Sequence, residues 1–325
     1  MIRGSRRLAL LAAAALGMLG VSSVALAGDT RSAAAPPKPV VESAPVLPVT
    51  AKDKDGKVVV VKDASRIVPL NGDIAEVIFA LGLTRNIVGV DTSATYPAKA
   101  VAGLPKIGYQ RTLSAEGILS LRPTLVVGSA LAGPQTVIDQ LRTAGVTVLL
   151  IPDFRGLDAG SRKLRTLGKA LGVPKRGERL AKQVDRQITI AKREIASVAT
   201  RPKVAFLYLR GTQVQMIGGN DSGADALIAA AGGRDMGTAL GIESFKTLTP
   251  ESLVAGQPDV ILVLSAGLQS VGGVDGLLRI PGVAQTPAGK NRRIIHYDDQ
   301  LLLGLGPRTG MALRQLIRGL HPDVR

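Results

Sequence analysis

One short segment occurs twice in this chain, once in each half, and this duplication constrains the fold more than any other feature. The first copy, YQRTLSAE, spans residues 109–116, and the second, SFKTLTPE, spans residues 244–251. In both copies a cation precedes Thr-Leu, a Ser or Thr and then a Glu, and a Pro follows seven residues after the Glu. Each copy leads into an apolar run typical of a buried strand, at 124–127 and 260–264. The duplication therefore predicts two related lobes with a cleft between them.

The two copies differ in one chemically important residue, because only the first has a tyrosine, Tyr109, before its cation. In an extended segment Tyr109 and Arg111 point to the same side. A guanidinium at that position favours an anionic phenolate, and tyrosinate is a recognised axial ligand of haem iron. Arg111 and Lys246, one from each lobe, would suit the two haem propionates. The alternative is that Tyr109 is a half-buried packing residue in front of a helix.

The two glutamates of the repeat, Glu116 and Glu251, have a local explanation. Each follows a candidate helix N-cap, Ser114 or Thr249, so each falls in a first helical turn where the helix dipole favours a negative charge. The duplication would also place one carboxylate at a corresponding point on each lobe. Such a pair suits docking on a partner with two-fold symmetry.

The N-terminus has the pattern of an export signal over residues 1–27. Three arginines precede an apolar stretch at 8–26, and small residues end at Ala27, which predicts cleavage after that residue. A retained membrane anchor is the alternative. The sequence contains no cysteine, so a lipid-linked cysteine, a disulfide and a thiolate metal site are excluded. We expect a periplasmic protein, with residues 28–57 as a flexible tether.

The chain is strongly basic, with a formal net charge of +16, or +13 once the three arginines of the signal are removed. This balance permits anionic partners or simply gives a solvated basic surface. Nucleic acid is disfavoured by the export signal and by an aromatic content of only 2%, which leaves few stacking platforms for bases.

Alternating strand and helix patterns predict an α/β fold with two Rossmann-like lobes, mostly parallel sheets and one long connecting helix. The predicted N-terminal lobe spans 58–172, the inter-lobe helix 173–200 and the C-terminal lobe 201–325. Expected elements of the first lobe are a hairpin of 58–61 with 66–70 and strands at 87–90, 124–127 and 146–151. Apolar residues recur every three or four positions along the helix, which could extend about 30 Å.

No catalytic constellation can be assembled from the sequence. The G-x-S-x-G and H-E-x-x-H motifs and the dinucleotide-binding glycine pattern are absent. The chain has two histidines, of which His296 ends a predicted strand and His321 lies near the C-terminus, where we expect it to be exposed. We therefore predict a binding protein rather than an enzyme, and the alternative from another class is an exported α/β enzyme that uses one of the scattered carboxylates.

The chain resembles the substrate-binding proteins of bacterial ABC importers for haem, within the long-helix class that also serves vitamin B12 and ferric siderophores. The resemblance covers residues 65–320 and is strongest at 108–123, 267–273 and 302–308. It implies that Tyr109 ligates ferric haem b, that Arg111 supports this ligand and the propionates, and that Glu116 and Glu251 face arginines of the permease. The implied partner is an inner-membrane ABC permease with its ATPase, served by a monomeric carrier.

The sequence departs from the haem-binding pattern in two places. An arginine tends to precede the Gly-Leu pair of the second lobe, whereas this chain has Ala266, and Arg210, Met216 or Lys246 would have to compensate. A histidine that some relatives use to hold a second stacked haem has no counterpart before His296, which predicts one haem per protein. A ferric siderophore or a corrinoid remains the alternative ligand.

Overall fold

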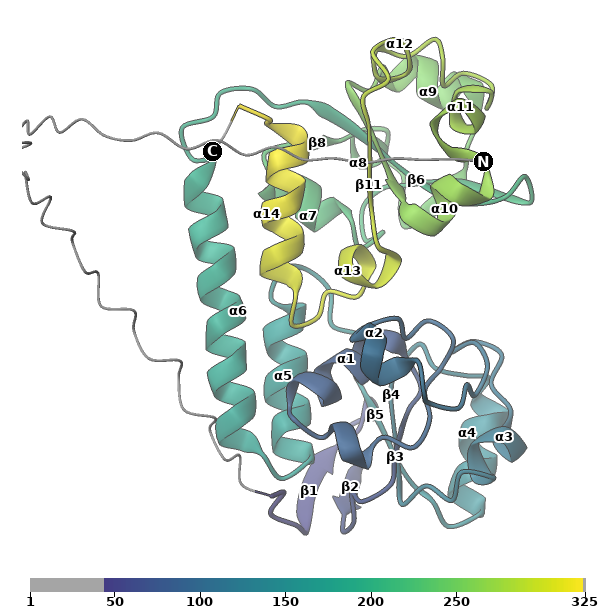
Figure 1. Ribbon diagram of the computed structural model, residues 1–325, viewed down its shortest axis with the longest axis vertical. Helices are drawn as coiled ribbons and strands as arrows, with labels where there is room; N and C mark the ends of the chain where they lie inside the picture. Colours follow the sequence, from purple (N-terminus) through teal and green to yellow (C-terminus); the bar gives the residue numbers. More distant parts are fainter. Residues whose placement is uncertain (1–43, 324–325) are drawn as a thin grey trace, which may run out of the picture. The chain divides into compact units, whose positions relative to one another are not determined.

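The N-terminal lobe is built on a three-stranded parallel sheet in the order β3-β4-β5. The computed structural model describes residues 44–323 (Figure 1). The strands are β3 (Ile67–Pro69), β4 (Leu125–Ser129) and β5 (Thr147–Ile151), and nearly all of their residues are buried. Their short, continuous apolar runs are typical of parallel strands covered on both faces. The strands predicted at 66–70, 124–127 and 146–151 are thus confirmed.

Helices cover both faces of this sheet. Ile67, Leu125 and Leu149 belong to one hydrophobic cluster with α1 and α5, whereas Val126 and Val148 belong to another with α3 and α4. The helices of the lobe are α1 (Gly72–Ala80), the 3-10 turn η1 (Thr84–Asn86), α2 (Ala98–Val101), α3 (Ala115–Leu119), α4 (Gln135–Thr143) and α5 (Ala159–Ala170). Successive residues of each strand therefore point into two separate cores.

The first structured segment corrects two predictions. The predicted tether, 28–57, includes a strand, β1 (Val49–Lys52), which pairs antiparallel with β2 (Val58–Val61), whereas residues 28–43 lie outside the described residues. Asp53 closes the turn by accepting the backbone N–H groups of Asp55 and Lys57, each at 2.9 Å. The predicted hairpin of 58–61 with 66–70 is wrong, because β3 pairs with β4 in the central sheet instead.

The strand predicted at 87–90 is reduced to two isolated bridges. Ile87 pairs with Ile67, and Val90 pairs with Lys106. Val88 donates its backbone N–H to the carbonyl of Ile67 at 3.0 Å, so the segment follows the sheet edge without forming a full strand.

The long connecting helix is α6 (Pro174–Glu194), which begins within a residue of the prediction and ends six residues before position 200. Proline occupies its first turn, where its missing N–H has no helical partner to lose. Beyond Glu194, Ala196 and Val198 bond back only three residues, which ends the regular helix. The predicted apolar face is buried, and α6 packs on α5 of the first lobe and on α14 of the second (Figure 1).

The C-terminal lobe has a mixed sheet in the order β11-β10-β6-β7-β9, with β8 also paired to β6. Strands β6, β10 and β11 are parallel, in line with the predicted mostly parallel sheet, and so is the short strand β8, which was not predicted. Strands β7 and β9 run antiparallel and extend one edge. The short Gly211–Gln213 connection between β6 and β7 leaves room for a hairpin but not for a crossover helix. The strands are β6 (Lys203–Arg210), β7 (Val214–Gly218), β8 (Arg234–Asp235), β9 (Phe245–Thr247), β10 (Val260–Leu264) and β11 (Ile294–Tyr297).

The helices of this lobe are mostly short. They are α7 (Asp225–Ala230), α8 (Met236–Ala239), α9 (Pro250–Gly256), α10 (Ser265–Ser270), α11 (Gly273–Leu278), α12 (Pro287–Lys290), α13 (Asp299–Leu303) and α14 (Thr309–Leu320). His321 is buried rather than exposed, because it caps the end of α14 with Nε2 3.0 Å from the carbonyl oxygen of Ala231. Within residues 44–323 no helix is long and apolar enough to cross a membrane.

Candidate functional site: the inter-lobe cleft

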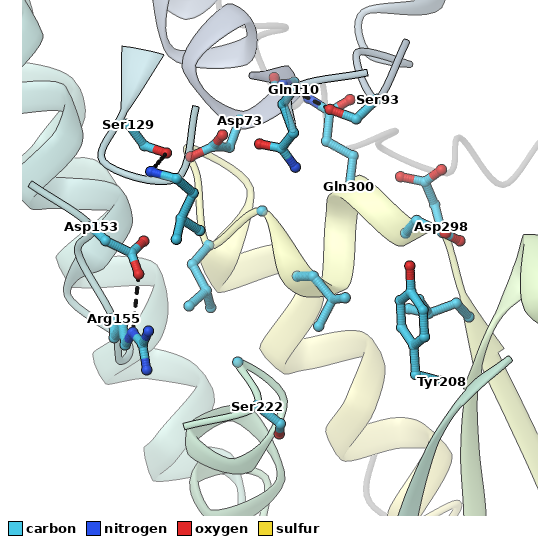
Figure 2. Close-up of a pocket in the computed structure, with 18 of the residues that line it drawn as sticks. Asp73, Ser93, Gln110, Ser129, Asp153, Arg155, Tyr208, Ser222, Asp298 and Gln300 are labelled. Atoms are coloured by element: carbon cyan, nitrogen blue, oxygen red, sulfur yellow. Dashed lines mark hydrogen bonds and ion pairs between the residues drawn. The ribbon is translucent and has the colours of Figure 1, made fainter. Parts of the chain in front are cut away.

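A cleft of about 1060 Å³ lies between the two lobes and is lined by residues from both. Residues 44–323 belong to one compact unit, which contains both walls of the cleft. The carboxyl ends of the parallel strands supply the lining, with Ser129 ending β4, Asp153 following β5, Arg210 ending β6 and Ser265 following β10. Ligands of open α/β sheets bind at this edge. Figure 2 shows polar side chains of both lobes converging on the cavity.

The wall of the first lobe presents Tyr109 and Arg111, as predicted, and Tyr109 is 42% exposed. Its loop is fixed from three directions. Thr92 donates its N–H to the carbonyl of Gly108 at 2.9 Å, and Thr112 donates to the carbonyl of Tyr109 at 2.8 Å. The side chain of Asn71 donates to Gln110. Tyr109 is therefore held on a rigid loop with its side chain open to the cleft.

Arg111 is the available cation of this wall. Its side chain lines the cleft, and it forms no hydrogen bond or ion pair with any other residue of the described chain. An unpaired guanidinium at a cleft surface can bind a carboxylate of a ligand in bidentate fashion.

The wall of the second lobe presents a second Tyr-x-Arg pair, Tyr208 and Arg210, from the end of β6. The guanidinium carbon of Arg210 lies 4.5 Å from the Tyr208 ring centroid, and Arg210 also donates to Asp299. Phe245 packs against the Tyr208 ring in an edge-on arrangement at 5.7 Å. The sequence prediction named Arg210 but missed Tyr208, although the repeated Tyr-x-Arg spacing was a usable signal.

The two tyrosines face the same cavity. Burial raises the pKa of the Tyr208 phenol above its usual value of 10, and Arg210 partly opposes this change. Tyr109 raises the pKa of Tyr208 slightly further and Arg111 lowers it, and all four residues line the same cleft. Without a ligand, Tyr208 is thus a neutral phenol at physiological pH.

Met216 lines the cleft, as predicted, but Lys246 does not. In the β7–β9 pairing Lys246 lies opposite Ile217, whereas Phe245 lies opposite Gly218. Because side chains alternate along a strand, Phe245 faces the cleft side and Lys246 is exposed on the other face. The equivalence between the two repeats fails here because Arg111 lies in a loop and Lys246 lies in a strand.

The opposite end of the cleft contains a charged group that the sequence did not indicate. Arg155 donates to Asp153 of its own lobe at 3.0 Å and forms an ion pair with Asp221 of the second lobe at 3.1 Å. Asp153 beside Arg155 raises the pKa of that guanidinium. Asp221 is 66 residues away from Arg155 in the chain and belongs to no shared motif, so only the fold brings the two together.

Glu116 and Glu251 lie in the first turns of α3 and α9, as predicted. Ser114 accepts the N–H of Gly117, and Thr249 forms a reciprocal capping box with Ser252. Both glutamates are exposed and lie outside the cleft lining. Each lobe thus presents one exposed carboxylate in the first helical turn of its repeated segment.

Neither the histidines nor the acidic residues form a metal-binding group in the described chain. No cluster of three or more His, Asp or Glu residues that could hold a bare metal ion occurs within residues 44–323. His296 is exposed, with Nδ1 3.0 Å from the Ser265 hydroxyl. The cleft lining therefore offers two phenols, three arginines and several apolar side chains, which suits a largely apolar ligand with anionic groups.

A cleft between two α/β lobes joined by one long helix defines a substrate-binding protein of the long-helix class. The chain belongs to the periplasmic binding protein family, whose family model matches residues 67–301. That family consists of substrate-binding proteins of transport systems.

Solved structures of similar proteins agree with this assignment. The periplasmic heme-binding protein RhuT from Roseiflexus sp. RS-1, solved in apo form, is 54% identical with a TM-score of 0.79, over 81% of this chain and all of RhuT. The periplasmic heme-binding protein BhuT, solved in complex with two hemes, is 40% identical with a TM-score of 0.74, over 80% of this chain and 99% of BhuT.

Curated relatives are more distant. The uncharacterized ABC transporter substrate-binding lipoprotein YvrC of Bacillus subtilis is 25% identical over 94% of this chain and 95% of its own length. The vitamin B12-binding protein of Yersinia pestis is 24% identical over 64% of this chain and 71% of its own length.

Proposed function

We propose that this protein binds ferric haem b in the inter-lobe cleft and delivers it to an ABC permease without chemical conversion. The observation that carries the proposal is the pair of facing Tyr-x-Arg motifs, Tyr109 with Arg111 and Tyr208 with Arg210, in one cleft. The pair supplies phenolic oxygens for iron and guanidinium groups for propionates from both walls.

The residues present fit haem chemically. Tyrosinate is an established axial ligand of haem iron, and Tyr109 is the more exposed of the two phenols, so it is our candidate for the ferric ligand. Arg111 and Arg210 are our candidates for the propionates, and Met216 and Phe245 offer apolar contact to the macrocycle. Lys246, which faces away from the cleft, has no role in this proposal.

The names of the similar proteins support haem over the alternative ligand. RhuT and BhuT are heme-binding proteins at 54% and 40% identity, whereas the vitamin B12-binding relative shares 24% over a smaller part of the chain. A corrinoid or ferric siderophore remains the second candidate, since the periplasmic binding protein family includes such carriers.

Delivery requires a partner and a compartment. Glu116 and Glu251 are the residues that we propose dock on the permease, which works with its ATPase, and the carrier is proposed to act as a monomer. We place the protein in the periplasm after cleavage behind Ala27, a residue that lies outside the described part of the chain.

The proposal is tested by titrating the mature protein, residues 28–325, with ferric haem and recording the visible spectrum. We expect a saturable complex with a tyrosinate-type high-spin ferric spectrum, which is lost in Tyr109→Phe and altered in Tyr208→Phe. Tyr297→Phe is the matched control, because its hydroxyl donates to the Gln315 carbonyl away from the cleft. Weak binding that is equal in all four proteins would contradict the proposal, and tight binding of cobalamin would favour the corrinoid alternative.

A further inference from the structure

A buried polar junction joins the two lobes at the floor of the cleft. Asp73 and Glu76 of α1 and Lys163 of α5 come from the first lobe, and Gln300 of α13 and Arg308 before α14 come from the second. The geometry points to this junction, acting with helix α6, as the element that fixes the separation of the lobes and the position of Tyr109 in the ligand-free protein. The assignment concerns the protein itself and holds whichever ligand is carried.

The strongest contact in the junction is the pair of Glu76 with Arg308. Arg308 donates Nε to Oε1 at 2.9 Å and Nη2 to Oε2 at 2.8 Å, so both carboxylate oxygens are bound. The side chains are only 5% and 14% exposed. The Arg308 guanidinium also lies 3.7 Å from the Tyr96 ring centroid, which covers its outer face. A planar bidentate pair of this kind tolerates little sliding of one lobe on the other.

Both the nitrogen and the oxygen of the Gln300 side-chain amide form hydrogen bonds to the first lobe. Its Nε2 donates to the Gly72 carbonyl at 2.7 Å and to Glu76 at 2.9 Å. Its Oε1 accepts the N–H of Thr95 at 2.7 Å and the Thr95 hydroxyl at 2.9 Å. The Gln300 residue is 7% exposed, so a separation of the lobes would leave several buried polar groups without partners.

A third contact closes the junction beside α5. Lys163 Nζ donates to Asp73 at 2.6 Å and to the Gly304 carbonyl of the second lobe at 2.8 Å. Next to it the backbones meet directly, because a Cβ built on Gly160 would lie 2.3 Å from the Gly306 carbonyl oxygen. The lobes therefore touch through a polar network and through a close backbone approach that only glycine permits.

The same network reaches the ligand-binding wall. Gln300 fixes Thr95, which belongs to the loop that also contains Thr92. Thr92 in turn bonds to the Gly108 carbonyl, directly before Tyr109. Gln300, a residue of the second lobe, is thus a positioning residue for the tyrosine loop of the first.

The test uses the absence of cysteine in the native chain, which allows two nitroxide labels to be introduced specifically. Gln140→Cys on α4 and Val254→Cys on α9 place one exposed label on each lobe. Electron–electron double resonance then gives the inter-lobe distance distribution of the ligand-free mature protein. We expect one narrow distribution, which Gln300→Leu broadens and Gly160→Ala shifts to longer distance. Gln183→Leu, on the exposed face of α6, should leave it unchanged.

A broad distribution in the unsubstituted protein would overturn the inference, as would an unchanged distribution in both Gln300→Leu and Gly160→Ala. The measurement on the unsubstituted protein and the Gly160→Ala variant remain informative if Gln300→Leu does not fold. Because no ligand is added, failure of this inference leaves the haem proposal intact, and failure of haem binding leaves this inference intact.

Discussion

Arg210 stacks on the ring of Tyr208, with its guanidinium carbon 4.5 Å from the ring centroid, while Asp299 binds the same guanidinium from the side. The stacking and the ion pair fix Arg210 at the cleft wall before any ligand arrives, whereas Arg111 on the opposite wall has no such partner in the described chain. The Arg210 guanidinium is therefore held in place before binding, whereas the Arg111 side chain is available to a ligand.

The sequence suggested three cationic ligand-binding residues, Arg111, Arg210 and Lys246. The structure predicts that replacing them affects haem affinity unequally. Arg111→Gln and Arg210→Gln should each weaken haem binding about tenfold or more, because a charge-assisted hydrogen bond contributes roughly 1.5–3 kcal/mol. Lys246→Gln should leave the affinity unchanged, because Lys246 faces away from the cleft. Titrations of the three variants at one ionic strength check this order. A loss of affinity in Lys246→Gln equal to that in the arginine variants would contradict it.

Stoichiometry gives a second prediction. We expect one haem at saturation, although the relative BhuT was solved with two hemes and the cleft here measures about 1060 Å³. No histidine lies among the cleft-lining residues of the described chain, so a second stacked ring would lack an imidazole ligand. Native mass spectrometry of the saturated protein gives the count directly. A two-haem species of comparable affinity would contradict this prediction. It would show that the size of the cleft, rather than the number of iron-coordinating side chains, sets the number of bound haems.

A third prediction concerns Asp91, which is fully buried behind the tyrosine loop. Its Oδ2 accepts from Ser93 at 2.6 Å, whereas Oδ1 has no partner, and burial raises the pKa of Asp91 from 3.8 to about 6. Between these two pH values the unfolded chain has lost a proton that the folded protein retains. The contribution of Asp91 to stability therefore falls as pH rises from about 4 to about 6, by roughly 3 kcal/mol in total.

Asp91→Asn removes this ionisation, so the free energy of unfolding of the variant should rise relative to the unsubstituted protein across the same pH window. Urea unfolding at pH 4, 5, 6 and 7 measures the difference in unfolding free energy between the two proteins. This difference should reach a plateau above pH 6. Asp63→Asn, at an exposed position, is the control. If the difference in unfolding free energy between Asp91→Asn and the unsubstituted protein does not change with pH, the prediction is wrong.

The sequence predicted the elements that are determined by residues close together in the chain. The buried strands β4 and β10, the caps at Ser114 and Thr249 and the long helix α6 all follow from apolar runs, cap residues and helical periodicity. The antiparallel edge strands β7 and β9 were not predicted, because strand direction depends on pairing partners far along the chain. The position of Lys246 outside the cleft lining was missed for the same reason, since its orientation is set by the register with Ile217.

The junction of Glu76, Gln300 and Arg308 could not have been found from the sequence. Glu76 lies more than 200 positions from Gln300 and Arg308, and all three resemble ordinary surface side chains when read locally. Tyr208 is different, because its spacing from Arg210 repeats that of Tyr109 from Arg111, and only its position in an apolar strand hid it. Long-range polar contacts thus need the fold, whereas repeated short motifs do not.

The last prediction separates binding from delivery. Glu116→Lys combined with Glu251→Lys should reduce haem import in proteoliposomes that contain the cognate permease and ATPase by at least tenfold, because like charges across an interface oppose docking. Both glutamates are exposed and lie outside the cleft, so haem affinity and the visible spectrum should not change. Glu243→Lys, an exposed glutamate of the second lobe outside the repeated segment, is the matched control and should import normally. If the double variant supports import at the unsubstituted rate, the duplicated glutamates serve only as first-turn helix residues, and the permease must dock through other contacts.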